Sequence, residues 1–213
     1  ANGVVARPRE LRGRERLMAE PPQSWLLVGD DGLEVSPQDD RRHRLVTLPN
    51  GLCALVTSDP TSEKAAAALA VMVGAMADPP ELPGLAHFCE HMCFLGSEKY
   101  PEENAYKKYL SAHGGKSNAS TSSDRTVFQF DVAAAHFEGA LDIFAQFFVA
   151  PLFTESATDR EMKAVDSEDS KNRCNDGRRL LQVSRALASP THPFSKFSTG
   201  NLQTLREDVP PGL

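Results

Sequence analysis

The order of the elements in the sequence predicts an α/β (α+β) fold, in which a strand-rich opening is followed by several helices. Two β-rich runs, 44–48 and 52–57, flank Asn50-Gly51, the commonest sequence signal for a tight hairpin. Residues 126–132 alternate apolar and polar side chains, as a half-buried strand does. Residues 137–148 place apolar side chains at i, i+3, i+4 and i+7, which indicates a helix that faces the core.

Composition excludes two classes of partner. The formal charge of −6 argues against a nucleic-acid surface, which needs clustered basic residues. No apolar run approaches the ~18 to 20 residues that cross a bilayer, so we expect no membrane contact. The 213 residues are enough to bury one core.

Residues 1–35 are polar and irregular, and they predict a flexible lead-in. Only residues 25–28 are apolar enough to dock, either as a short strand or as a surface anchor. The first residues carry arginines without the apolar core of a secretory signal, and their glutamates fit an organelle transit segment poorly. Four cysteines without paired spacing favour a reducing compartment, so we expect a cytoplasmic location, with an organelle as the alternative.

The first half of the chain continues from the hairpin into a longer apolar run. Residues 66–73 are apolar almost throughout, which predicts a central strand buried on both faces, although their alanines would also allow a helix. Residues 74–83, with three prolines, form a connecting loop. A helix over 103–112 should point Tyr106, Tyr109 and Leu110 inward and end at His113-Gly114-Gly115.

The second half contains two more predicted helices after 137–148. Residues 154–173 indicate an acidic amphipathic helix with Thr154 as its N-cap and with an apolar stripe of Ala157, Ala164 and Val165. Residues 178–188 indicate the other helix, and 191–194 a loop. The histidines with no partner in the sequence pattern are interpreted as surface residues: His43, His113, His136 and His192.

The run His87-Phe88-Cys89-Glu90-His91 carries the strongest chemical signal. If it is helical, His87, Glu90 and His91 fall on one face. Two imidazoles one turn apart can hold one metal ion, and the carboxylate lies beside whatever else the metal binds. The pattern predicts a catalytic zinc site, against the alternative of a chance recurrence. Cys89 and the nearby Cys93 are interpreted as packing residues.

A hydrolytic zinc ion needs three protein ligands and one open position. Glu161 and Glu168 are two turns apart on the predicted helix 154–173, so they share a face, and spacing alone does not choose between them. The alternative is a solvated charged face, since the same helix also carries Asp159, Asp166, Asp169 and Lys171.

Three runs resemble the inverted-zincin peptidases of the pitrilysin, insulysin and nardilysin group. They are Pro83-Gly84-Leu85-Ala86-His87-Phe88-Cys89-Glu90-His91-Met92, then Phe94-Leu95-Gly96, then Lys99-Tyr100-Pro101-Glu102-Glu103-Asn104. The later run from Asp159 to Glu168 is similar to the helix that carries this family's third ligand, at the family's usual separation from His91. The resemblance extends from about residue 36 to about residue 206.

This resemblance implies a zinc metalloendopeptidase with helices packed on one face of a mixed or antiparallel sheet. Zinc would be held by His87, His91 and Glu168, with Glu90 as general base for a zinc-activated water and Glu161 as a supporting carboxylate. It also implies that peptide substrates add as an extra strand beside Asn118, Ala119 and Ser120. Insulysins usually have an aromatic residue where Ser120 stands, whereas nardilysins resemble this chain.

Two alternatives stay open beside this reading. A catalytically insufficient fragment or a non-catalytic scaffold or binding subunit could have the same fold. A LuxS-type metal-dependent lyase shares the histidine motif but typically has a cysteine as third ligand, for which Cys174 is the candidate. Similar proteins have about four related domains, so we expect residues 36–213 to be an N-terminal catalytic domain of a longer chain, partnered by a C-terminal half or a second copy.

Overall fold

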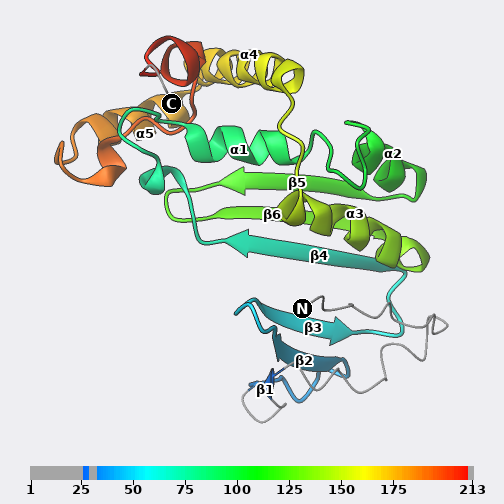
Figure 1. The fold of residues 1–213 in the computed structure, drawn as a ribbon. Helices are drawn as coiled ribbons and strands as arrows, with labels where there is room; N and C mark the ends of the chain where they lie inside the picture. Colours follow the sequence, from blue (N-terminus) through cyan, green and yellow to red (C-terminus); the bar gives the residue numbers. More distant parts are fainter. Residues whose placement is uncertain (1–25, 29–32, 211–213) are drawn as a thin grey trace, which may run out of the picture. The chain divides into compact units, whose positions relative to one another are not determined.

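The structure, a computed structural model, describes residues 26–28 and 33–210 (Figure 1). The chain divides into two compact units, residues 1–62 and residues 63–213. Most of the predicted flexible lead-in, and Trp25 within it, lies outside the described residues. In the part of the chain that is described, none of the helices has the length and apolar character to cross a membrane.

The first unit contains a three-stranded antiparallel sheet in the order β1-β2-β3. Its strands are β1 (Leu26–Val28), β2 (Arg42–Thr47) and β3 (Cys53–Ser58). The predicted hairpin is confirmed, because β2 and β3 pair in register across the Asn50-Gly51 turn. Gly51 has φ +86°, a left-handed conformation that favours glycine, and its N–H donates to the Leu48 carbonyl. Of the two alternatives for residues 25–28, the described part adopts the short strand.

The second unit contains the sheet that supports the site. It has the order β4-β6-β5, all antiparallel, with β4 (Lys64–Val71), β5 (Lys116–Thr121) and β6 (Thr126–Ala133). The central strand is β6, in which Thr126, Phe128, Phe130 and Val132 are buried.

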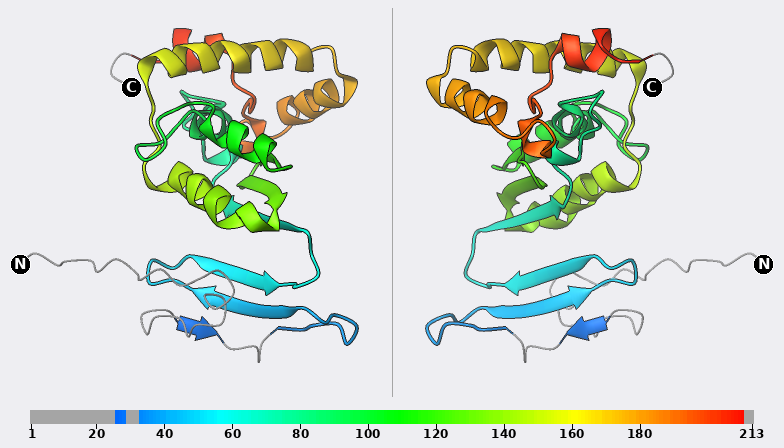
Figure 2. Two further views of the ribbon diagram at one scale, coloured as in Figure 1. Left: turned by 90° about the vertical axis from the view of Figure 1, so that its right-hand side faces the viewer. Right: turned by 90° about the vertical axis from the view of Figure 1, so that its left-hand side faces the viewer.

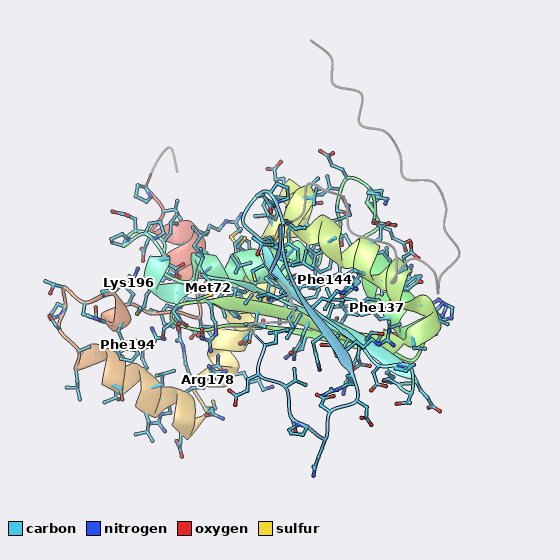
Figure 3. All side chains as sticks on the ribbon, turned by 90° about the horizontal axis from the view of Figure 1, so that it is seen from below. Met72, Phe137, Phe144, Arg178, Phe194 and Lys196 are labelled. Carbon is cyan, nitrogen blue, oxygen red and sulfur yellow. The ribbon has the colours of Figure 1, made fainter. Side chains whose placement is uncertain are left out.

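The prediction of a central strand over 66–73 with two buried faces is wrong. Among the described residues β4 lies at an edge of its sheet, and its side chains alternate between exposed and half-buried. An alanine run hides this alternation, because the same apolar residue occupies both faces and the sequence shows no period of two. Met72, just after the strand, is 70% exposed (Figure 3).

Three helices cover one face of this sheet, as predicted (Figure 2). They are α1 (Leu85–Cys93), α2 (Ala105–Ala112) and α3 (Phe137–Val149). Tyr106 of α2 and Phe144 and Phe147 of α3 pack in one cluster with Phe128 and Phe130 of β6. The Tyr106 ring meets those of Phe130 and Phe147 edge to face. The predicted α+β class, with helices on one face of an antiparallel sheet, is confirmed.

Helix α4 (Glu155–Asn172) crosses α1 on the side away from the sheet, and α5 (Asp176–Ala186) follows it (Figure 1). Thr154 is the N-cap of α4, as predicted, and its hydroxyl accepts from the Ala157 N–H. The predicted apolar stripe is wrong at Ala164, which is exposed. The buried arc is centred near Val165 and turns toward Asp169, so Ala164 falls just outside it.

The interpretation of four histidines as surface residues is confirmed for His192, which is exposed, whereas the other three are only half-buried and make specific contacts. His43 contacts the hydroxyl of Thr57 at 2.9 Å, and the His192 side chain caps a 3-10 turn at Pro193–Ser195. His113 and His136 stack with ring centroids 3.6 Å apart. The contacts of His43 and of the His113–His136 pair join residues distant in sequence, so no local pattern predicts them. The cap formed by His192 is local, because its side chain accepts from the Phe194 N–H. Of the two cysteines of α1, Cys93 packs in the core as predicted, whereas Cys89 is exposed.

Candidate metal centre

The motif helix begins at a fixed point because its N-terminus is capped from the preceding loop. Gly84 is the N-cap, with φ +100°. The buried carboxylate of Asp78 accepts the N–H groups of Gly84 and Ala86, each at 2.8 Å, which satisfies donors that an α-helix leaves unpaired. Burial raises the pKa of Asp78, against the opposing effect of these two donors. This cap sets the rotation of α1 and therefore the direction of its histidines.

His87, Glu90 and His91 share one face of α1, as the spacing predicted, and all three line one cavity of about 450 Å³. Helix α4 brings Glu161 and Glu168 to the same cavity. The cavity therefore combines two elements that are far apart in the sequence.

The two glutamates of α4 occupy different places. Glu161 Oε1 accepts a hydrogen bond from His91 Nδ1 at 2.7 Å, on the side of the ring away from His87. Glu168 Oε2 lies 3.7 Å from Nε2 of both His87 and His91. The structure thus separates two residues that spacing alone left equivalent.

Hydrogen bonds at the Nδ1 atoms fix the tautomers of both imidazoles. His87 Nδ1 donates to the Thr199 carbonyl at 2.7 Å, and His91 Nδ1 donates to Glu161. In the neutral rings the two Nε2 lone pairs then face one another at 3.2 Å, with the Glu168 carboxylate beside them. Three hydrogen-bond acceptors, the two Nε2 atoms and the Glu168 carboxylate, therefore lie together with no donor between them. A bound cation would remove the repulsion among these three acceptors.

The spacing of these three atoms fits a zinc ion. Nε2 of His87, Nε2 of His91 and a carboxylate oxygen of Glu168 form the one group of possible metal ligands found within the described residues. A point equidistant from the three atoms lies about 2.0 Å from each, which matches zinc–nitrogen and zinc–oxygen bonds. Cys174, the third ligand required by the lyase alternative, is exposed and is not in this group.

The pKa values of His91 and Glu161 shift as expected for a hydrogen-bonded pair. The hydrogen bond to Glu161 raises the pKa of His91, in spite of the opposing effect of burial. The same bond lowers the pKa of Glu161. The negative charge of Glu161 therefore makes the His91 ring more basic, and a more basic imidazole is a stronger metal ligand.

Glu90 is 7% exposed and is held by a residue that the sequence analysis missed. The hydroxyl of Thr121, the last residue of β5, donates to Glu90 Oε2 at 2.6 Å. Alternation along a strand turns Thr121 to the face opposite Ser120, toward α1. The side chain of Glu90 is thereby oriented next to the three ligand atoms.

The segment 196–202, here called the C-terminal strap, was also missed. Lys196 Nζ donates to the carbonyls of Met76 and Asp78, in the loop before α1. Gly200 packs against Gly84 so closely that a Cβ on Gly84 would lie 2.2 Å from the Gly200 Cα.

At its other end the strap is bound to α4. Asn201 Nδ2 donates to Asp169 Oδ2 at 3.1 Å, and the Leu202 N–H donates to Asp166 Oδ1 at 3.0 Å. The strap therefore joins the helix that carries the histidines to the helix that carries Glu168. The glycine and asparagine in Thr199-Gly200-Asn201 were the available signal for a constrained backbone, but not for its partners.

The predicted substrate residues Asn118, Ala119 and Ser120 lie on β5 and line the same cavity. Strand β5 is at the edge of its sheet, and in the described part of the chain only β6 pairs with it. The structure places these residues beside the metal centre, and their role stays a prediction.

Comparison with known proteins identifies the family. Residues 53–191 match the family model described as Insulinase (Peptidase family M16). The chain is 54% identical to the insulin-degrading enzyme of Mus musculus over 198 residues. This aligned region covers 90% of the chain and 19% of the mouse protein. A Schizosaccharomyces pombe relative, whose name describes a zinc protease, is 48% identical over 192 residues, which cover 90% of the chain and 20% of the relative.

A solved structure agrees with these matches. The crystal structure of pitrilysin superposes with a TM-score of 0.81 and 40% sequence identity, over 85% of this chain and 19% of that one. The chain thus spans about a fifth of the length of the proteins it matches. The resemblance found in the motif is confirmed, and the chain belongs to the insulinase family, peptidase family M16.

Proposed function

We propose that this chain carries the catalytic centre of a zinc metalloendopeptidase that hydrolyses peptides or small proteins. The observation that carries the proposal is the convergence of His87 Nε2, His91 Nε2 and a Glu168 oxygen within 4.8 Å of one another, beside the buried carboxylate of Glu90. The relatives support the reaction class, since the names of two of them describe an insulin-degrading enzyme and a zinc protease.

Two imidazole nitrogens and one carboxylate oxygen, with a position left open, form a donor set typical of catalytic zinc. When bound, zinc supplies Lewis-acid polarisation of the scissile carbonyl and increases the acidity of water. Glu161 and the Thr199 carbonyl hold the two imidazoles in the tautomer that presents Nε2 to the metal.

Glu90 acts as the general base. Its carboxylate accepts a proton from the water that attacks the peptide bond, and then delivers that proton to the leaving amine. The hydroxyl of Thr121 holds Oε2 through a hydrogen bond of 2.6 Å, so the other oxygen, Oε1, remains to take the proton. The burial of Glu90, which is 7% exposed, restricts the orientation of this carboxylate.

The substrate binds in an extended conformation along the free edge of β5. Strand addition supplies main-chain hydrogen bonds that do not depend on the side chains of the substrate. Asn118, Ala119 and Ser120 are the residues of that edge which line the cavity. We place the activity in a reducing compartment such as the cytoplasm, because all four cysteines are free thiols.

Digestion of a fluorogenic peptide by the zinc-loaded protein tests the proposal, with chelator and with Glu90→Gln as parallel arms. We expect chelator to abolish cleavage and zinc to restore it. Glu90→Gln should retain one zinc ion per chain, measured by elemental analysis, and lose at least about a hundredfold in rate. Cleavage that survives both treatments would refute the mechanism. Zinc and peptide binding without cleavage would favour the non-catalytic alternative.

A further inference from the structure

We propose that Lys107 and Arg178 give the metal cavity a preference for peptides with an acidic side chain near the scissile bond. This inference rests on the proposed peptidase function and adds the substrate class. Neither residue belongs to the histidine motif or to the β5 edge.

The two cations reach the cavity from different elements. Lys107 is on α2. Arg178, which is labelled in Figure 3, is in the first turn of α5. Both line the cavity that contains His87, Glu90, His91, Glu161 and Glu168. A peptide that lies along β5 over this cavity would therefore meet basic side chains from two helices.

Charge in the cavity depends on these two residues. The lining contains three carboxylates, those of Glu90, Glu161 and Glu168, and two cationic side chains. With one divalent metal ion and neutral imidazoles, the cavity has a net charge of about one positive unit. Without Lys107 and Arg178 that net charge would be about one negative unit, and the cavity would repel an acidic substrate.

The guanidinium of Arg178 is available for a ligand. Within residues 33–210 it makes no ion pair with a carboxylate, whereas the adjacent Arg179 is paired with Asp176 at 3.0 Å. Its backbone is fixed, because the Arg178 N–H donates to the Asn175 side chain that caps α5. The guanidinium of Arg178 can therefore form a bidentate pair of hydrogen bonds with a substrate carboxylate, while its backbone stays fixed in α5.

The shared chemistry of the expected ligand is a carboxylate, which a peptide offers either as an Asp or Glu side chain or as its C-terminus. The cavity is lined by residues 117–121, nearly the whole length of β5, so a peptide paired along this strand presents side chains over the cavity, which favours the side chain. Peptides with free and with amidated C-termini distinguish the two sources.

Peptide binding provides a test that does not depend on turnover. Two fluorescent peptides that differ only by Glu or Gln at one position flanking the scissile bond are titrated, by anisotropy, into zinc-loaded protein carrying Glu90→Gln. The peptides are amidated, and a parallel set has a free C-terminus. Arg178→Gln, Lys107→Gln and the double variant are compared in this background with Arg179→Gln, the matched control.

We expect the Glu peptide to bind about tenfold more tightly than the Gln peptide at low salt. Arg178→Gln should reduce this ratio to about two and the double variant to about one, while Arg179→Gln leaves it unchanged. Equal binding of the two peptides, or a ratio that survives the double variant, would overturn the inference. A preference found only with free C-termini would overturn it in favour of the chain terminus.

Kinetics of protein without the Glu90 substitution separate this inference from the proposed function. Cleavage of the Glu and Gln peptides with equal kcat/KM would overturn the preference and leave the peptidase intact. Tighter binding of the Glu peptide without chelator-sensitive cleavage would support the preference and contradict the catalytic role.

Discussion

The carbonyl oxygen of Thr199 accepts a 2.7 Å hydrogen bond from Nδ1 of His87, a residue 112 positions earlier in the chain. The bond fixes which nitrogen of His87 has a free lone pair, so a backbone carbonyl, and not only side chains, orients the possible ligands. Because the C-terminal strap also binds Asp166 and Asp169 of α4, it connects the two helices that carry the three possible metal ligands.

Removal of the part of the strap that follows Ser198 should weaken the metal site without unfolding the core. A chain ending at Ser198 lacks the Thr199 carbonyl and the Asn201 side chain, and we expect zinc affinity to fall about 10- to 100-fold. A chain ending at Asp208 keeps both contacts and serves as the control. Competition with a chromophoric chelator measures the affinity, and circular dichroism checks the fold. Equal affinities in the two truncated chains would contradict the role of the strap.

Gly84→Ala should push the strap away from the N-terminus of α1. A Cβ there would meet backbone atoms of Gly200 at 2.2 and 2.4 Å, and the positive φ adds strain, so we expect a loss of about 2–4 kcal/mol in unfolding free energy. Gly114→Ala is the control, because its φ is +67° but nothing lies within 4 Å, and it should cost about 1 kcal/mol. Urea denaturation compares them. Similar losses of unfolding free energy in the two variants would show that the strap can move away from the added methyl group at little cost, and would contradict the prediction.

Local features of the chain could be predicted from the sequence. The face shared by His87 and His91, the Asn50-Gly51 hairpin and the Thr154 cap each depend on residues within one or two turns, where helix and strand periods apply. Helix and strand periods together also predicted the fold class.

The contacts that complete the site could not be predicted in this way. Which of Glu161 and Glu168 lies beside the two Nε2 atoms depends on how α4 crosses α1. The position of β4 at a sheet edge depends on strand pairing. The contacts of Thr121 and Thr199 join β5 and the strap to α1, and the sequence gives no period for such pairs. Family resemblance, not spacing, selected Glu168 as the ligand.

Replacement of Thr121 should affect catalysis more than metal binding. Thr121→Val removes the hydroxyl that holds Glu90 Oε2 but keeps the shape of the side chain, so kcat should fall about tenfold with zinc content unchanged. Thr121→Ser keeps the hydroxyl and should recover most of the rate. Steady-state kinetics with elemental analysis decide the matter. A loss of zinc in Thr121→Val would instead indicate a structural role.

Glu161 should contribute charge as well as orientation to the metal site. Glu161→Gln keeps an oxygen for the His91 Nδ1–H but removes the negative charge, whereas Glu161→Ala removes both. We expect zinc affinity at pH 7.5 to fall about tenfold in the first variant and about a hundredfold in the second. Affinities measured with a competing chelator test this order. Equal losses in both variants would mean that only the charge matters.

The carboxylate of Asp142 should stabilise the fold at neutral pH and lose this effect in strong acid. It accepts hydrogen bonds from Lys99 Nζ at 2.6 Å and from the Tyr100 hydroxyl at 2.5 Å, and these donors lower its pKa. A folded-state pKa below the unfolded value gives stability that is complete above the unfolded pKa and is lost as the pH falls through the folded one. Because the side chain is 40% exposed, Asp142→Asn should cost only about 0.5–1 kcal/mol at pH 7 and almost nothing near pH 2. Urea unfolding at both pH values measures this difference against Asp124→Asn, whose carboxylate is 55% exposed and lies 3.5 Å from its nearest cation, and a pH-independent difference would contradict it.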